Sequence, residues 1–141
     1  MDRRVAVVTG GTRGIGYGIS SVLASQQYSL VLGYNSNYDA AKQAKEELET
    51  QYGVKVVTVP GDISVPATVI ALFQAVKDNF EGHCTAFIHN AGLYVGVTTT
   101  SAEAPARLNP DEPWDERVYD YYQKVMHVHV QVQEGALQKL L

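Results

Sequence analysis

A glycine-rich run near the N-terminus has the composition of a phosphate-binding turn. Residues 9–16 (TGGTRGIG) follow the apolar run Val5–Val8 and precede apolar residues at helical spacing. Glycines at such a junction let the backbone turn tightly, so that its N–H groups and the positive end of the helix dipole approach a pyrophosphate. The spacing is neither Gly-x-Gly-x-x-Gly nor that of a phosphate-loop NTPase. Its place between strand and helix still favours a dinucleotide site over a plain tight turn.

Other reactive side chains form weaker patterns. The single Tyr-x-x-x-Lys sequence, from Tyr38 to Lys42, opens an expected helix away from the glycine turn, and we do not expect it to be catalytic. His127 and His129 have metal-ligand spacing on a strand, but on a helix their rings point about 200° apart. No third ligand is evident, so no metal is predicted. Cys84 precedes an apolar run without a basic partner in view, which predicts a core thiol.

The elements that must position the glycine turn alternate regularly along the chain. Apolar runs predict four strands, at Val5–Val8, 30–32, 54–59 and Ala86–Ile88. Helices between them are predicted from three apolar stripes: Ile15, Ile19, Val22 and Leu23; Ala41, Ala44, Leu48 and Tyr52; Val69, Leu72, Phe73, Val76 and Phe80. Uniformly apolar strands need cover on both faces, so we predict an α/β fold with a parallel sheet in the order 3-2-1-4.

Length and composition limit the class of protein. The chain has 141 residues, 45% of them hydrophobic and 18% charged, which predicts one globular domain over 1–141. Its formal charge of −4, without a Lys/Arg cluster, argues against a nucleic-acid partner. No apolar run approaches the roughly 18 residues of a membrane span. A single cysteine and no signal-peptide pattern favour a cytoplasmic location.

Three motifs together resemble the signatures of the short-chain dehydrogenases/reductases. Residues 9–16 resemble the cofactor-binding motif of that family, residues 90–92 (NAG) its second signature, and residues 61–64 (GDIS) its third. The resemblance implies a Rossmann-type, doubly wound fold in which the glycines hold the pyrophosphate, Asp62 faces the adenine ring and Asn90 steadies the central strands. For Asp62 a plain turn role is the alternative. The cofactor-binding residues so predicted are Gly10, Thr12, Arg13, Gly14, Ile15, Gly16, Tyr34, Asn35, Ser36, Asp62, Ile63, Asn90, Ala91 and Gly92.

The charges near the second strand predict which dinucleotide is bound. NAD enzymes place an acid at the end of that strand, about 20 residues past the glycines, to hold the ribose 2′-hydroxyl. Tyr34 stands there, followed by Asn35 and Ser36, and Arg13 is placed to pair with a 2′-phosphate. These residues favour NADP(H) over NAD(H), the alternative being that Arg13 is a solvated loop residue.

The resemblance also implies which catalytic groups to expect. The family uses a Tyr-x-x-x-Lys pair with a Ser and an Asn, and the lysine lowers the tyrosine pKa. No such pair follows residues 90–92, and His129 falls at the position of the family Asn, where a packed histidine is the alternative. We therefore interpret the fold as C-terminally incomplete, with a core over 3–92. A loop is predicted over 96–115 and a helical tail over 116–141, although the alternation of Val128, Val130 and Val132 would equally suit a strand.

Two functional hypotheses remain. The first is a short-chain-type oxidoreductase that uses NADP(H) to interconvert a small carbonyl compound and an alcohol, with its catalytic half absent and the chain inactive alone. The alternative is a non-catalytic dinucleotide-binding or interaction domain. Without a further strand beside it, the apolar run Ala86–Ile88 would be an unpaired sheet edge, and such an edge invites association or aggregation unless it is covered. A homo-oligomer is expected.

Overall fold

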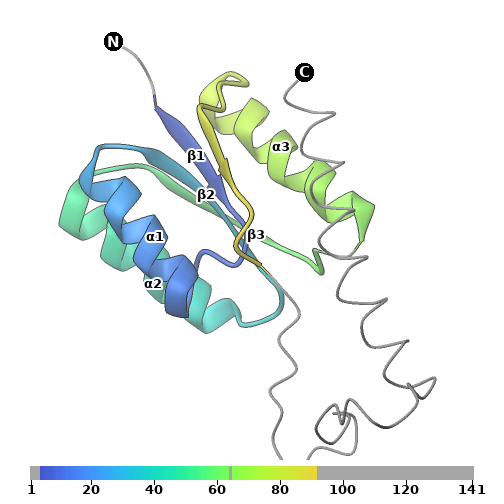
Figure 1. Ribbon diagram of the computed structural model, residues 1–141, viewed down its shortest axis with the longest axis horizontal. Coiled ribbons are helices and arrows are strands. Elements are labelled where there is room, and N and C mark those ends of the chain that lie inside the picture. The colour runs from blue at the N-terminus through green and yellow to red at the C-terminus, as the bar shows by residue number, and fades with distance from the viewer. Residues whose placement is uncertain (1–3, 64, 92–141) are drawn as a thin grey trace, which may run out of the picture.

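Strands and helices alternate strictly in the computed structural model, which describes residues 4–63 and 65–91 (Figure 1). The elements are β1 (Val5–Val8), α1 (Gly14–Ser25), β2 (Ser29–Tyr34), α2 (Tyr38–Tyr52), β3 (Val56–Pro60), α3 (Pro66–Phe80) and β4 (Ala86–Ile88). All paired strands are parallel, in the order β3-β2-β1-β4. The predicted parallel sheet and its order are confirmed, although β2 is longer than predicted and β3 begins two residues later. The predicted loop 96–115 and tail 116–141 lie outside the described residues.

Helices cover both faces of the sheet. In Figure 1, α1 and α2 lie on one face and α3 lies on the other. Alternate residues of β1 therefore enter different cores: Ala6 and Val8 pack on the side of α1 and α2, whereas Val5 and Val7 pack toward α3. Every residue of β1 is buried, which explains why this strand is continuously apolar rather than alternating.

The connections place a crevice at the carboxyl ends of the strands. The chain moves outward from β1 to β2 and β3, and then returns through α3 to β4 on the other side of β1. The connections after β1 and after β3 thus lead to opposite sides of β1, which makes the boundary between β1 and β4 a switch point of the topology. Ligands of open α/β sheets bind at such a point, outside the carboxyl ends of the strands. The topology alone therefore predicts a ligand site formed by the segments that follow the strands.

The buried face of α1 differs from the predicted stripe. Ile15 and Val22 are 80% and 64% exposed, whereas the buried residues of α1 are Gly16, Ser20 and Ala24. The helix approaches the glycine turn so closely that only small side chains fit between them, and this proximity decides which face is buried. Of the predicted stripe, Ile15 and Val22 therefore do not face the core, whereas Ile19 and Leu23 are partly buried and pack against it.

The strand β4 forms one edge of the described sheet. It pairs with β1, and all three of its residues are half-buried. The expected homo-oligomer stays a prediction. In the part of the chain that the structure describes, no helix is long and apolar enough to cross a membrane.

Candidate functional site

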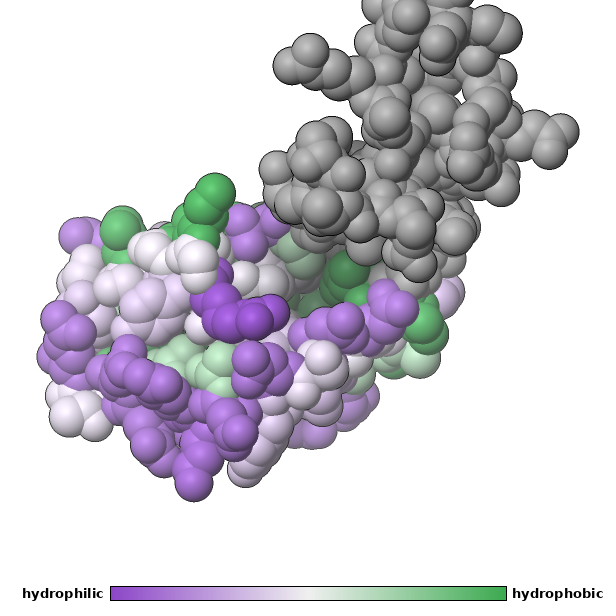
Figure 2. Space-filling model, turned by 90° about the horizontal axis from the view of Figure 1, so that it is seen from below, coloured by the Kyte–Doolittle hydropathy of each residue, from purple (hydrophilic) through white to green (hydrophobic). Residues whose placement is uncertain are grey.

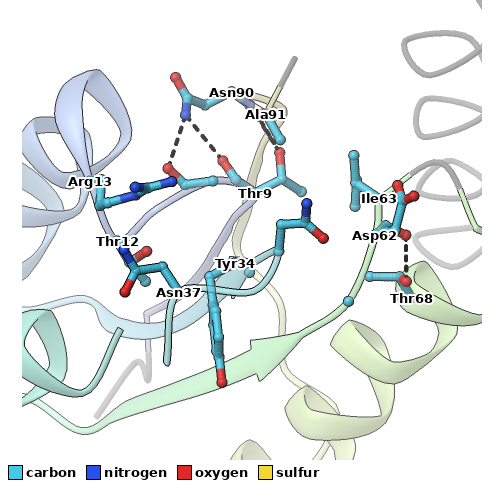
Figure 3. Close-up of a pocket in the computed structure, with 14 residues that line it drawn as sticks. Thr9, Thr12, Arg13, Tyr34, Asn37, Asp62, Ile63, Thr68, Asn90 and Ala91 are labelled. Carbon is cyan, nitrogen blue, oxygen red and sulfur yellow. Dashed lines mark hydrogen bonds between the residues drawn. The ribbon is translucent and has the colours of Figure 1, made fainter. Parts of the chain in front are cut away.

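A cleft of about 430 Å³ opens at the carboxyl ends of the four strands. Figure 2 views the described part from this end, where mostly polar side chains surround scattered apolar patches. The residues that line the cleft come from the last two residues of β2, from the segments that follow β1, β2, β3 and β4, and from the start of α3 (Figure 3). They are Thr9, Gly10, Thr12, Arg13, Gly33, Tyr34, Asn35, Asn37, Gly61, Asp62, Ile63, Thr68, Asn90 and Ala91.

The glycine turn needs its glycines for two physical reasons. Gly10 and Gly14 adopt positive φ angles of +62° and +56°, where a side chain is strained. Gly16 is required for space, because a Cβ atom there would overlap the carbonyl oxygen of Gly10. The turn therefore brings its backbone into closer contact than any other residue type allows.

Hydrogen bonds hold this turn against α1 and β2. The Ser20 hydroxyl lies 2.9 Å from the carbonyl oxygens of both Gly11 and Gly16, either of which can accept its proton. On the other side, the Gly11 amide donates to the Gly33 carbonyl at 3.1 Å. The turn is thus fixed before any ligand binds.

The N-terminus of α1 is left without the groups that usually satisfy it. Its N-cap residue, Arg13, makes no side-chain capping hydrogen bond, and the first turn contains no acidic residue. By contrast, the Asn37 side chain caps α2 by accepting a hydrogen bond from the Ala40 amide at 3.0 Å. The first N–H groups of a helix lack partners within it, and its dipole favours an anion there. This end of α1 is therefore chemically suited to a phosphate group.

Asn90 joins the ends of β1 and β4. Its side-chain amide donates to the carbonyl oxygens of Thr9 and Gly10, both at 3.2 Å (Figure 3). The buried Thr9 hydroxyl in turn accepts hydrogen bonds from the backbone amides of Asn90 at 3.1 Å and Ala91 at 3.0 Å. These contacts fix the glycine turn relative to β4.

Charge is distributed unevenly around the cleft. Arg13, on the glycine turn, and Tyr34, at the end of β2, both line it, and Arg13 is exposed. Among the described residues that line the cleft, Asp62 is the only carboxylate. It lies across the cleft from Arg13, with Ile63 and Thr68 (Figure 3). The end of β2 therefore presents an aromatic ring and amide or hydroxyl groups, but no acid.

The structure brings most of the predicted site residues together. The predicted residues that line the cleft are Gly10, Thr12, Arg13, Tyr34, Asn35, Asp62, Ile63, Asn90 and Ala91. Those that do not line it are Gly14, Ile15, Gly16 and Ser36, although the first three begin α1 beside it. Gly92 and His129 fall outside the described residues.

Five lining residues were not predicted: Thr9, Gly33, Asn37, Gly61 and Thr68. Gly33 carried a usable signal, because a glycine inside an apolar strand often marks a close approach of backbone or ligand. Thr68 carried none, because a threonine in the first turn of a helix is common.

The side chains judged unsuitable for catalysis lie away from the cleft. Tyr38 is 63% exposed at the start of α2, and neither it nor Lys42 lines the cleft. Cys84 is half-buried, and this burial raises the pKa of its thiol, as in a core cysteine. Within residues 4–63 and 65–91, no group of three or more His, Cys, Asp or Glu side chains is placed to hold a metal ion.

Known proteins resemble this chain in sequence. The protein-family model described as short chain dehydrogenase matches residues 4–133. The uncharacterized oxidoreductase YgfF of Escherichia coli is 34% identical over 105 residues, which cover 74% of this chain and 42% of that protein. A hydroxynaphthalene reductase-like protein, Arp2 of Metarhizium anisopliae, is 34% identical over 117 residues, or 83% of this chain and 39% of that protein. The chain thus spans about two fifths of the length of these curated relatives.

Solved structures share the fold. L-sorbose reductase from Gluconobacter frateurii, complexed with NADPH and L-sorbose, aligns with a TM-score of 0.71 and 25% identity over 99% of this chain and 48% of that one. The alcohol dehydrogenase of the archaeon Thermococcus sibiricus, complexed with 5-hydroxy-NADP, aligns with a TM-score of 0.74 and 26% identity over 99% of this chain and 54% of that one.

Proposed function

This chain belongs to the short-chain dehydrogenase family, and we propose that its cleft binds NADP(H) for an oxidoreductase that interconverts a carbonyl compound and an alcohol. The observation that carries the proposal is that segments after all four strands converge on one cleft, with the glycine turn and Asn90 hydrogen-bonded to each other. The bound cofactor would supply hydride chemistry, and the protein would supply binding and orientation.

The glycine turn and the start of α1 would hold the pyrophosphate. Gly14, Ile15 and Gly16 begin the helix whose N-terminus lacks a side-chain cap, so they would act through backbone N–H groups rather than side chains. Because only their backbone N–H groups would contact the pyrophosphate, Ile15 can belong to the proposed site with an exposed side chain, and Gly16 can belong to it although there is no room for a Cβ atom. Gly10 and Thr12 line the adjoining wall of the cleft.

Arg13 and the end of β2 would select the phosphorylated cofactor. A 2′-phosphate placed between Arg13 and Tyr34 would gain a charge-assisted hydrogen bond and meet no carboxylate from β2. Asn35 would add a polar contact to it from the cleft lining, whereas the next residue, Ser36, does not line the cleft. The complexes of two similar enzymes with NADPH and 5-hydroxy-NADP support this assignment.

The opposite wall would receive the adenine ring. Asp62 is exposed and Ile63 is half-buried against the core on the α3 side, so together they offer one polar and one apolar surface. Asn90 and Ala91 would hold the floor between the two walls. The proposed NAD(P)-binding domain extends over residues 1–141.

Proton transfer to a small carbonyl substrate would need groups that the described cleft does not contain. Tyr38 and Lys42, the single Tyr-x-x-x-Lys in the sequence, lie outside the cleft lining. We therefore expect residues 1–141 alone to bind the cofactor without reducing a carbonyl compound. Location in the cytoplasm stays a prediction from the sequence.

Equilibrium titration of the purified protein with NADPH and NADH tests the proposal. We expect saturable one-site binding of NADPH and weaker binding of NADH. Failure of a folded, monodisperse sample to bind either dinucleotide would overturn the proposed function.

A further inference from the structure

Thr68 is a buried polar side chain in the wall of the cleft. It is the third residue of α3 and is 8% exposed. It lies beside Asp62 and Ile63, the residues proposed to receive the adenine ring (Figure 3). The N-cap residue of α3 is Val65, whose side chain makes no capping hydrogen bond. The first turn of α3 therefore has no capping hydrogen bond from its N-cap side chain, and Thr68 places this turn in the cleft wall.

The Thr68 hydroxyl fixes the direction of one backbone carbonyl. Its Oγ1 donates to the main-chain oxygen of Asp62 at 2.6 Å, and the Val65 amide donates to the same oxygen at 3.0 Å. A carbonyl oxygen has two lone pairs, so this pair of donors satisfies it fully. The peptide group that follows the Asp62 Cα atom thus has little freedom to rotate.

The preceding residue is held from two sides. Gly61 has a φ of +146°, and a Cβ atom there would lie 2.7 Å from the Thr68 Oγ1 atom and 2.9 Å from its Cγ2 atom. On its other side, the Gly61 amide donates to the Tyr34 carbonyl at 2.9 Å. Thr68 therefore packs on one end of the turn and hydrogen-bonds to its middle.

We propose that Thr68 is a positioning residue whose hydroxyl fixes Asp62 and Ile63 for the adenine half of the cofactor. This inference rests on the proposed function, in which those two residues receive the adenine ring. Thr68 acts through the turn, because its hydroxyl proton is already donated to the Asp62 carbonyl. Loss of the hydroxyl would let the turn relax, and the adenine half would then meet a less ordered wall.

A role confined to starting α3 makes a different prediction. It implies a lower melting temperature for any variant without the hydroxyl, but no selective change in the binding of one half of the cofactor. Ser21 provides a matched control, because its hydroxyl lies 3.0 Å from that of Tyr52, outside the cleft lining. Ser21→Ala thus removes a comparable hydrogen bond without touching the cleft.

Calorimetry on Thr68→Val, Thr68→Ala, Thr68→Ser and Ser21→Ala would decide between these roles. The probes are NADPH, adenosine 2′,5′-bisphosphate for the adenine half, and reduced nicotinamide mononucleotide for the other half. Loss of one neutral hydrogen bond predicts about 3- to 10-fold weaker binding of the first two probes by the Val and Ala variants. Thr68→Ser and Ser21→Ala should keep the wild-type affinities, as should every variant for the mononucleotide.

Several outcomes would overturn the inference. Wild-type affinity for adenosine 2′,5′-bisphosphate in the Val and Ala variants would show that the hydroxyl does not position the turn. Equal weakening by Thr68→Ser, or of the mononucleotide, would show a general structural effect. If Thr68→Val does not fold, Thr68→Ala and Thr68→Ser still decide, because neither adds bulk. A folded wild type that binds no NADPH would overturn the proposed function and this inference together.

Discussion

Replacing Arg13 with alanine should weaken NADPH binding about tenfold and leave NADH binding nearly unchanged. A charge-assisted hydrogen bond contributes about 1.5–3 kcal/mol, which corresponds to about 10- to 100-fold in affinity. Arg13 is exposed, so solvent screening places the expected effect at the lower end of this range. The Arg13 side chain makes no capping hydrogen bond to α1, so the variant should keep the wild-type melting temperature.

Titration calorimetry with both dinucleotides, at low and at high salt, measures this effect. The difference between wild type and variant should shrink at high salt, because the Debye length falls from about 10 Å at 0.1 M to about 3 Å at 1 M. Arg4→Ala is the matched control: Arg4 is also exposed, but its guanidinium lies 5.4 Å from the ring centre of Tyr28, and it does not line the cleft. Equal losses for NADPH and NADH, or none for either, would refute the reasoning.

Tyr34→Asp should move the preference toward NADH by repelling a 2′-phosphate, and unchanged ratios of dissociation constants would contradict this. Gly16→Ala should destabilise the fold by about 1–3 kcal/mol, because the added Cβ atom would overlap backbone atoms. Gly18→Ala should instead stabilise α1 by about 0.5–1 kcal/mol, because no atom lies within 4 Å of the added Cβ atom; denaturant melts measure both effects. The side chains of Gln43 and Tyr17 donate hydrogen bonds to the Glu47 carboxylate and lower its pKa. These hydrogen bonds therefore stabilise the fold above the ordinary carboxyl pKa, and their contribution is lost as the pH falls through the lowered pKa of Glu47. The difference in unfolding free energy between wild type and Tyr17→Phe should therefore shrink from neutral pH to about pH 3. A difference that stays constant over this range would contradict a stabilising hydrogen bond between Tyr17 and the Glu47 carboxylate. Mass-verified 1–141 protein should show no appreciable NADPH oxidation with carbonyl substrates, and robust turnover would disprove this.

The sheet was predictable from sequence because its strands are buried on both faces. Val5 and Val7 serve one core while Ala6 and Val8 serve the other, so no polar residue interrupts β1. Such a run separated by helical stripes has few solutions other than a parallel sheet with helices on both sides. The glycine turn was predictable for a related reason, since positive φ angles and close contacts leave little choice of residue.

The buried face of α1 was not predictable from hydrophobicity. Close approach to the glycine turn buries Gly16 and Ser20, while the larger Ile15 and Val22 remain exposed. A count of apolar residues records the tendency to leave water, but it does not record how much room the neighbouring backbone leaves. For the same reason the sequence did not indicate that Thr68 lines the cleft, because its place there depends on a hydrogen bond to a carbonyl oxygen six residues earlier.

Amide chemical shifts of the isotope-labelled protein, recorded as NADPH is added, test the central claim most directly. Binding in the cleft predicts the largest shift changes in residues 10–16, 61–63 and 90–91, which come from three separate segments of the chain. Residues 26–28 and 83–85, at the amino ends of β2 and β4, should change least. Saturable changes concentrated in these latter segments, or no changes at all in a folded sample, would contradict the account.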